Sequence, residues 1–331
     1  MSMIMMTHAA AVREGLAEEM RRDPLVWALG EDLSTAHGGT SADQYLGLID
    51  EFGDKRIVNT PISENTIMGA AVGAAVAGTR PVADLRMADF GMCAVDELVN
   101  QAAKIRYMFG GQARVPLVVR QAIGVRKGGA AQHSQSTEAW YIHTPGLVVV
   151  APATPSDAKG LIKSAIRTDD PVVYMEHKDL WMAEGQVSDN PNDIIDIGKA
   201  SIMREGSDIT IVSWSKMALL ALEAADQLKS AGISAEIINL RSLWPWDKDT
   251  VYKSVGKTGR LLVAQESVQV AGFGAEISAD ITENLNHSLK TYVRRIGAPR
   301  TPVPYSEPME NEYRVTATRI TKKAKELFST N

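Results

Sequence analysis

The alternation of short apolar segments with segments of helical pattern is the strongest constraint on this fold. The apolar segments are continuous runs, as at 25–29, 81–85 and 115–119, and do not alternate with polar residues. Apolar residues at helical spacing lie between them, for example along 95–103. Continuous apolar strands joined by helices predict a parallel sheet that is covered by helices on both faces.

The second half of the chain repeats this pattern and indicates a second domain. Apolar strands are predicted at 209–212, 235–238 and 261–264, each followed by a helical segment. Between the halves, residues 184–198 are polar and include a proline, which is typical of a linker. We therefore predict an α/β fold with two parallel-sheet domains, at 1–185 and 201–331, joined by a linker at 186–200.

The composition indicates a soluble globular protein. Of its 331 residues 45% are hydrophobic and 23% charged, and the net charge of −5 gives no reason to expect nucleic acid or an anionic membrane as a partner. Cys93 is the single cysteine, which excludes an intrachain disulfide and a cysteine-based zinc site. No apolar run approaches the ~20 residues of a membrane span, and the short apolar start lacks the features of a signal peptide. We expect a cytoplasmic enzyme or enzyme subunit.

One stretch, at 60–78, combines a turn with an unusual helix. Pro61 closes a short strand, Ser63 is a candidate N-cap, and Glu64 follows in the first helical turn, where the helix dipole favours a carboxylate. The helix behind it consists largely of glycine and alanine, which suggests that another backbone packs closely against it. Taken alone, Glu64 is either a surface carboxylate of a helix start or a buried acid that faces a ligand.

Most short catalytic motifs are absent or weak. The sequence has no phosphate-binding GxxxxGK[ST] loop, no zinc-binding HExxH and no GxSxG nucleophile turn. The segment GFGAEI at 272–277 resembles a dinucleotide fingerprint only loosely, and a tight turn that opens a helix explains it better. His133 lies in a glycine-rich loop at 124–135 after a strand, where it is either solvated or placed at a ligand site.

Several segments together resemble one enzyme family across nearly the whole chain. They occur in family order: TPISE (60–64), AAKIRYMFGGQ (102–112), VPLVVR (115–120), AAQHSQS (130–136), HTPGL (143–147), DAKGLIKSAIR (157–167), GISAEIINLRSL (232–243), GFGAEI (272–277) and TPVPY (301–305). The chain resembles the beta subunit of the thiamine-diphosphate-dependent decarboxylating component of 2-oxo acid dehydrogenases, with the pyruvate and acetoin branch most similar. The resemblance implies a transketolase-like pyrimidine-binding domain followed by a transketolase C-terminal-like domain.

The resemblance assigns roles to four residues. Glu64 corresponds to the acid that exchanges a proton with the aminopyrimidine of the cofactor, chemistry for which a buried carboxyl with a raised pKa is suited. Phe90 matches the aromatic residue that stacks on the pyrimidine, and His133 matches an active-site histidine near the reacting centre. Arg86 stands near the pyrimidine where relatives carry an uncharged residue, which predicts an altered substrate preference.

The resemblance also implies metals and partners. Relatives hold a structural potassium ion at the positions of Leu117, Ala165, Thr168 and Asp170, although Thr168 departs from the acidic residue often found there. The GDG motif that holds magnesium and the diphosphate is missing from this chain, so an alpha subunit is expected to supply it. The implied assembly is a two-plus-two heterotetramer in which the helix at 66–78 lies at a subunit contact, together with a lipoyl-bearing acyltransferase core.

The predicted function is that of an oxidoreductase subunit of the acetyl-transferring 2-oxo acid dehydrogenase type. It decarboxylates a pyruvate-like 2-oxo acid and transfers the acyl group to a lipoyl carrier. Alternatives are an acetoin dehydrogenase beta subunit, the pyrimidine half of a split transketolase-like enzyme, and a non-catalytic scaffold for the acyltransferase. A nicotinamide dehydrogenase is disfavoured because its fingerprint is missing.

Overall fold

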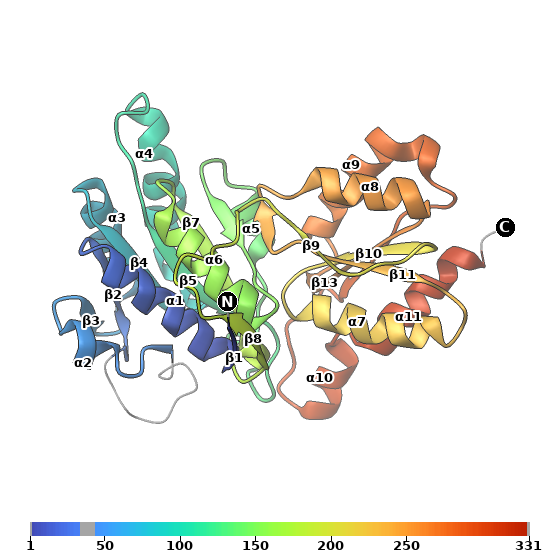
Figure 1. Cartoon of the computed structure of the whole chain (residues 1–331), viewed down its shortest axis with the longest axis horizontal. Coiled ribbons are helices and arrows are strands. Elements are labelled where there is room, and N and C mark those ends of the chain that lie inside the picture. Colours follow the sequence, from blue (N-terminus) through green and yellow to red (C-terminus); the bar gives the residue numbers. More distant parts are fainter. Residues whose placement is uncertain (1, 34–43, 330–331) are drawn as a thin grey trace. The chain divides into compact units, whose positions relative to one another are not determined.

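The computed structural model describes residues 2–33 and 44–329 and forms two compact units (Figure 1). The first unit consists of Met1–Ile123 and Trp140–Ile197, and the second of Gly124–Ala139 and Gly198–Asn331. The predicted boundaries placed all of 1–185 in one domain. Packing instead assigns the segment 124–139 to the second unit, which sequence continuity alone could not indicate.

The first unit is built on a parallel sheet. Its strands follow the order β6-β7-β5-β4-β2-β3, and all neighbouring strands in this order are parallel. Their bounds are β2 (Val26–Glu31), β3 (Ile57–Thr60), β4 (Arg80–Met87), β5 (Val118–Ile123), β6 (Val148–Val150) and β7 (Val172–His177). A parallel sheet that is buried on both faces requires apolar strands throughout, and β5 and β7 are buried at every position.

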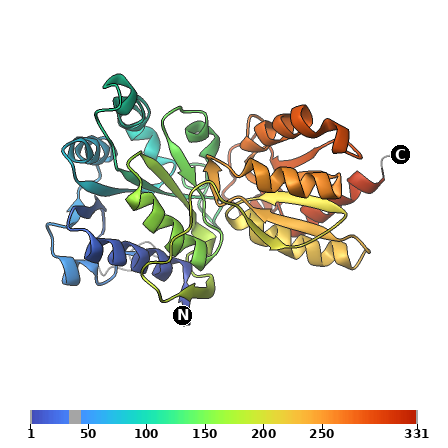
Figure 2. The ribbon, with the colours of Figure 1, turned by 45° about the horizontal axis from the view of Figure 1, so that its top comes forward.

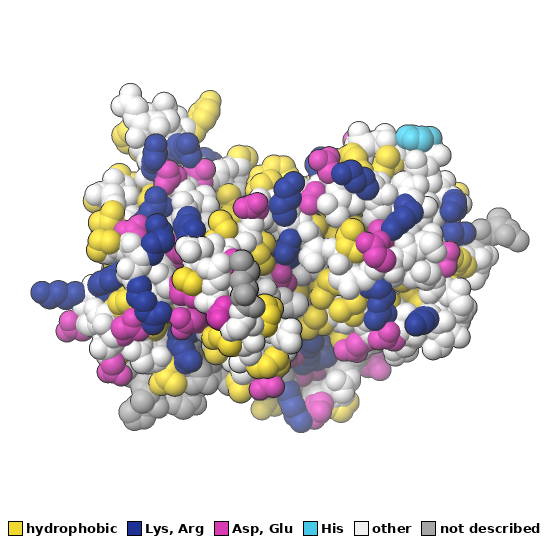
Figure 3. All heavy atoms as spheres, in the orientation of Figure 1, with side chains coloured by type: hydrophobic (Ala, Val, Ile, Leu, Met, Phe, Trp, Pro, Cys, Tyr) yellow, Lys and Arg dark blue, Asp and Glu magenta, His cyan; other side chains and the backbone are white. Residues whose placement is uncertain are grey.

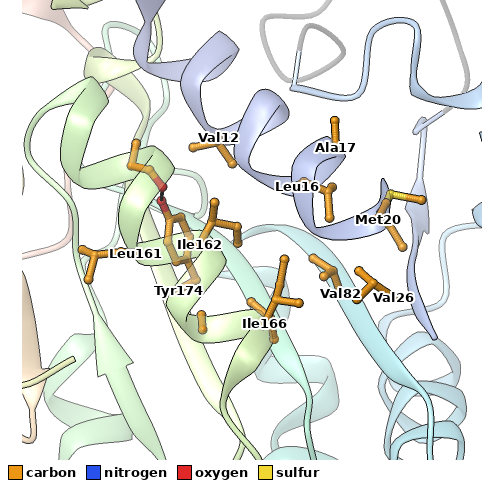
Figure 4. Packing of buried hydrophobic residues seen from close by; sticks show 14 of the residues in the cluster. Val12, Leu16, Ala17, Met20, Val26, Val82, Leu161, Ile162, Ile166 and Tyr174 are labelled. Carbon is orange, nitrogen blue, oxygen red and sulfur yellow. Dashed lines mark hydrogen bonds between the residues drawn. The ribbon is translucent and has the colours of Figure 1, made fainter. Parts of the chain in front are cut away.

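Helices cover both faces of this sheet, as Figure 2 shows. They are α1 (His8–Arg22), α2 (Leu48–Phe52), α3 (Glu64–Val76), α4 (Ala103–Met108), α5 (Glu138–Ile142) and α6 (Pro155–Arg167). Figure 4 shows α1 and α6 meeting over the strands, with Leu16, Ile162 and Val82 among the buried contacts. There the Tyr174 hydroxyl donates to the Ala158 carbonyl at 2.8 Å, so this buried polar group is satisfied.

The second unit repeats the architecture on a smaller scale. Its sheet has the order β14-β13-β10-β11-β9, in which β9 is antiparallel and the remaining pairs are parallel. In Figure 1 this sheet lies between α8 and α9 on one face and α7 and α11 on the other. The bounds are β9 (Ser201–Arg204), β10 (Ile209–Ser213), α7 (Lys216–Lys229), β11 (Ala235–Asn239), β12 (Ser242–Trp244), α8 (Lys248–Thr258), β13 (Leu261–Val268), α9 (Phe273–Leu285), β14 (Arg294–Ala298), α10 (Glu307–Tyr313) and α11 (Ala317–Lys325).

Strand order reverses at β10 in this second sheet. The chain passes from β10 to its neighbour β11 on one side and later inserts β13 on the other side. In open α/β sheets the crevice outside the carboxyl ends of strands at such a reversal is the usual ligand position. The carboxyl ends of β10 and β13 are therefore the place in this unit to examine for function.

The starts of α3 and α6 differ in how they are capped. Ser63 occupies the N-cap position of α3, but its side chain makes no capping hydrogen bond. Helix α6 is capped by Thr154, two residues before Ser156, because Thr154 and Asp157 form a reciprocal capping box. Pro155 then fits the first helical position, where no N–H is needed.

Two further elements differ from expectation. The predicted helix at 95–103 is a π-helical turn, Glu97–Ala102, that continues into α4. The predicted linker begins inside β8 (Glu184–Ser188), which pairs antiparallel with β1 (Met3–Thr7). Alternating exposure along β8 suits a two-stranded ribbon, so this polar segment contributes to the first unit.

The described surface carries charges of both signs. Figure 3 shows Lys and Arg interspersed with Asp and Glu on the visible face, without a large area of one sign. Among the described residues, no helix is long and apolar enough to cross a bilayer. The same described ranges contain no group of three or more His, Cys, Asp or Glu side chains arranged to hold a metal ion.

Candidate functional site

The carboxyl ends of β2, β3 and β4 bring polar side chains to one edge of the first sheet. Glu31 ends β2 and is paired in register with Thr60, the last residue of β3. Arg86 lies near the end of β4, the neighbour of β2 on its other side. Because the strands are parallel, these three residues share one edge, where α/β sheets place ligands.

Glu64 lies beside this edge as the first residue of α3. Only the turn Pro61–Ser63 separates it from Thr60, and its side chain is half-buried. Its negative charge is one of the causes that raise the pKa of Glu31, after burial of Glu31 itself. The charge of Glu64 thus acts on Glu31, and the helix dipole favours a carboxylate at this position.

Arg86 has an unusual backbone conformation, with φ at +61°. Its amide N–H donates to Asp84 Oδ1 at 2.8 Å, and the register of β4 against β5 shifts between Asp84 and Met87. Its Nε lies 3.8 Å from Glu31 Oε1, and its Nη2 lies 3.4 Å from Asp32 Oδ2. The side chain of Arg86 is 14% exposed and that of Glu31 is 18% exposed. A left-handed arginine costs about 1–3 kcal/mol, so Asp84 is needed to hold it.

A buried charge network lies behind Asp84. Arg120 on β5 is 1% exposed and donates to Glu176 Oε2 from Nε at 2.9 Å and from Nη2 at 2.7 Å. Asp84 lies 3.8 Å from Arg120 Nη1, and the Tyr45 ring faces the guanidinium with 5.1 Å to its centroid. Burial raises the pKa of Glu176, while Arg120 opposes this shift. The network fixes the position of Asp84 and, through it, of Arg86.

Several polar atoms near Glu64 are suited to a ligand. Among the described residues, Thr60 Oγ1, Arg86 Nη1 and Glu97 Oε2 are buried without a hydrogen-bond partner. Glu97 is tied to this edge because its other oxygen accepts from Asn65 at 2.7 Å. Buried donors and acceptors without partners cost about 1–3 kcal/mol each, which a bound polar heterocycle would relieve. These residues therefore fit the pyrimidine half of a thiamine cofactor.

The predicted aromatic and histidine residues lie in different units. Phe90 begins the short helix Phe90–Ala94 of the first unit and is half-buried. His133 belongs to the second unit, on the segment 124–139, and is exposed. The first unit thus groups Glu64, Arg86 and Phe90 on the segments that follow β3 and β4, and the roles assigned to them stay predictions.

The predicted potassium ligands already have partners. The Leu117 carbonyl accepts from Val172 N at 2.8 Å, and the Ala165 carbonyl accepts from Thr168 N at 3.2 Å. The Thr168 carbonyl accepts from Arg80 Nη1 at 3.1 Å. The Asp170 carboxylate forms an ion pair with Arg106. Each of these carbonyl oxygens keeps a second lone pair that can bind a cation, and the potassium site stays a prediction.

Comparison with known families identifies both halves of the chain. Residues 4–183 match the family described as "Transketolase, pyrimidine binding domain", and residues 198–320 match "Transketolase, C-terminal domain". The acetoin:2,6-dichlorophenolindophenol oxidoreductase subunit beta of Cupriavidus necator is 44% identical over 322 residues, 94% of each chain. The chain belongs to the beta subunits of the thiamine-diphosphate-dependent 2-oxo acid and acetoin dehydrogenases.

Other relatives of this beta subunit extend across the same family. The 2-oxoisovalerate dehydrogenase subunit beta of Bacillus subtilis is 38% identical, with 98% of this chain and 99% of that protein aligned. The mitochondrial pyruvate dehydrogenase E1 component subunit beta of Caenorhabditis elegans is 41% identical, over 97% and 92%. Both names are those of enzyme subunits.

A solved structure supports the fold of the beta subunit. "Split gene transketolase, inactive beta4 tetramer" has a TM-score of 0.79 and covers 98% of both chains at 22% identity. At this identity the match concerns the fold alone. It confirms the prediction of two α/β domains with mostly parallel sheets.

Sequence reasoning did not single out Glu31 and Asp84 as site residues of the beta subunit. The sequence contained a usable signal, because Glu31 lies two residues after the apolar run 25–29 and Asp84 lies within the run 81–85. Acids at or near the carboxyl ends of apolar parallel strands are candidates for a site on that ground alone.

Proposed function

We propose that this beta subunit, together with an alpha subunit, decarboxylates a pyruvate-type 2-oxo acid and passes the acyl group to a lipoyl carrier. The observation that carries the proposal is Glu64, half-buried at the start of α3, where its charge acts on Glu31. When bound, thiamine diphosphate would supply the nucleophilic carbon that this chemistry requires. Glu64 would hold or release a proton at a pyrimidine nitrogen, and Phe90 would stack on the ring.

The remaining partners are part of the same proposal. The chain lacks the GDG motif, so the alpha subunit would hold magnesium and the diphosphate in a two-plus-two heterotetramer. A lipoyl-bearing acyltransferase core would accept the acyl group, and the cytoplasm is the expected compartment. A structural potassium ion remains part of the sequence prediction, although its donors Leu117, Ala165, Thr168 and Asp170 are already engaged.

Acetoin cleavage is the second candidate, because an acetoin oxidoreductase beta subunit is 44% identical across 94% of this chain. The two substrates are distinguished by measuring pyruvate-dependent and acetoin-dependent dye reduction by the assembled alpha and beta subunits. Each assay is run with and without thiamine diphosphate. Sugar-dependent ketol transfer without lipoyl dependence would instead favour the split transketolase reading.

Substitution of Glu64 tests the site. Glu64→Gln keeps the size of the side chain but removes the exchangeable carboxyl proton, so we expect dye reduction to fall by about 100-fold or more. The control is Glu184→Gln, an exposed position on β8 of the same unit, which should retain full activity. Full activity in Glu64→Gln would refute the role given to this acid.

A further inference from the structure

The segment 124–139, here called the strap, crosses from one unit to pack in the other. The chain leaves the first unit after β5, packs within the second unit and re-enters the first at Trp140. Gly124 N donates to the Gln135 carbonyl at 3.2 Å, which closes the loop at its neck. Compact loops with closed necks are frequently functional, and this one carries His133.

The first end of the strap is anchored by a small apolar cluster. Val125 is 1% exposed and packs with three residues of the second unit, Ala298, Val303 and Tyr313. Arg314 Nη1 donates to the Val125 carbonyl at 2.9 Å, and Gly128 N donates to Glu310 Oε1 at 3.1 Å. Val303 belongs to the TPVPY segment (301–305), so one role of this motif is to pack against Val125 of the strap.

The other end is anchored by a buried carboxyl. Glu138 is 1% exposed, and its Oε1 accepts a hydrogen bond from Trp214 Nε1 at 3.2 Å. The Trp214 ring is 2% exposed and lies 5.7 Å from the Phe273 ring, centroid to centroid. Nearby, Ser136 Oγ lies 3.5 Å from Glu266 Oε2. This end of the strap is therefore held by side chains that follow β10 and end β13.

The second anchor occupies the position where ligands usually bind. Trp214 directly follows β10, and Glu266 lies toward the end of β13, the two strands between which the order of the sheet reverses. The crevice at such a reversal normally receives a ligand. Here it receives Glu138, so the second unit uses its binding position to hold a segment of its own chain.

The anchor is compatible with a neutral carboxyl. Burial raises the pKa of Glu138, while hydrogen bonds from Ser267 and Trp214 act in the opposite direction. Its Oε2 is buried without a partner among the described residues. Loss of the Trp214 donor would leave this buried carboxyl with fewer hydrogen bonds, which is costly for a buried polar group.

We propose that Glu138, Trp214 and Arg314 are positioning residues that fix the placement of His133 for the proposed reaction. His133 lies between the two anchors, so loss of either lets the strap move. Positioning errors of about 1 Å at a reacting centre can lower rates by up to two orders of magnitude. The inference rests on the proposed function for its catalytic readout, whereas the anchoring itself does not.

The first measurement follows hydrogen exchange of the strap in the full-length chain. Trp214→Phe removes the Nε1–H donor and keeps an aromatic ring against Phe273. We expect faster exchange in peptides covering 124–139. The matched control is Trp27→Phe, which removes the Trp27 hydrogen bond to Thr79 Oγ1 at 3.0 Å in the first unit. Unchanged strap exchange in Trp214→Phe would overturn the proposal.

The second measurement asks whether Trp214 acts through His133. In the alpha–beta assembly we expect Trp214→Phe to lower kcat by about tenfold. The same change should have little effect in a His133→Gln background, because residues that act as a unit are non-additive. Equal losses in both backgrounds would indicate general damage and would overturn the positioning role.

The two measurements separate this inference from the proposed function. If the wild-type assembly is inactive with both pyruvate and acetoin, the proposed function is refuted, and so is the catalytic role of the strap. The exchange data would then still decide whether Glu138 and Trp214 hold it. Glu138→Gln, which retains an acceptor for Trp214, should preserve slow exchange, and fast exchange in that variant would contradict the anchor.

Discussion

His8 makes the stability of the first unit depend on pH. It is the first residue of α1 and is 0% exposed. Neither ring nitrogen has a hydrogen-bond partner among the described residues. Burial, the Arg120 guanidinium and His177 lower the pKa of His8 from 6.5 to about 3. The folded state therefore accepts only the neutral ring.

The size of the effect follows from proton linkage. Above pH 6.5 the imidazole is neutral in both the folded and unfolded states, and the stability is fully present. Below pH 6.5 His8 becomes protonated in the unfolded chain, whereas in the folded chain it stays neutral down to about pH 3. The free energy of unfolding then falls by up to about 1.4 kcal/mol per pH unit, or about 5 kcal/mol over the whole range.

The assay is urea unfolding of wild type and His8→Leu at several pH values between 7.5 and 4.5. The other titrating groups are the same in both proteins, so the difference between the two curves isolates His8. Wild type should lose about 3 kcal/mol more than His8→Leu by pH 4.5. His143→Leu, at an exposed histidine of the same unit, should run parallel to wild type. Parallel curves for His8→Leu would refute the reasoning.

Two further predictions concern glycines. Gly146 and Gly78 share a φ of +101°. A Cβ at Gly146 would lie 1.9 Å from the Ala103 carbonyl oxygen, whereas a Cβ at Gly78 would meet no described residue within 4 Å beyond its own helix and chain neighbours. Gly78→Ala should cost about 1–2 kcal/mol, and Gly146→Ala more than about 4 kcal/mol, measured as unfolding free energies. Gly73 in α3 also has space for a Cβ. We therefore expect Gly73→Ala to raise the unfolding free energy of the isolated chain by about 1 kcal/mol. If α3 packs against another subunit, the same change should weaken assembly, measured by sedimentation.

The sequence predicted the strands well because most are continuous apolar runs. The runs at 209–212, 235–238 and 261–264 correspond to β10, β11 and β13, and 25–29 and 81–85 to β2 and β4. Helix starts were harder to predict. Both Thr154 and Ser156 can cap a helix, and only the reciprocal bond with Asp157 selects the first.

The candidate site was only partly predictable. A resemblance supplied Glu64, Arg86, Phe90 and His133, but the partners of Arg86 depend on how β2 and β4 are paired. The anchors of the strap were even harder to predict from the sequence. Glu138 and Trp214 are 76 residues apart in the chain. No local propensity indicates that Glu138 is buried beside a strand end of the second sheet.

The buried charges of the first unit connect its stability to its site. Arg120 lowers the pKa of His8 and, through its contact with Asp84, supports the carboxylate that holds the left-handed backbone of Arg86. A proton forced onto His8 would place a second cation beside Arg120 and weaken its hold on its carboxylate partners. Strain at functional sites persists only where the surroundings over-determine it. Because His8 in the folded unit stays neutral down to about pH 3, Arg86 should keep this support over the range in which acidification lowers the stability of the unit.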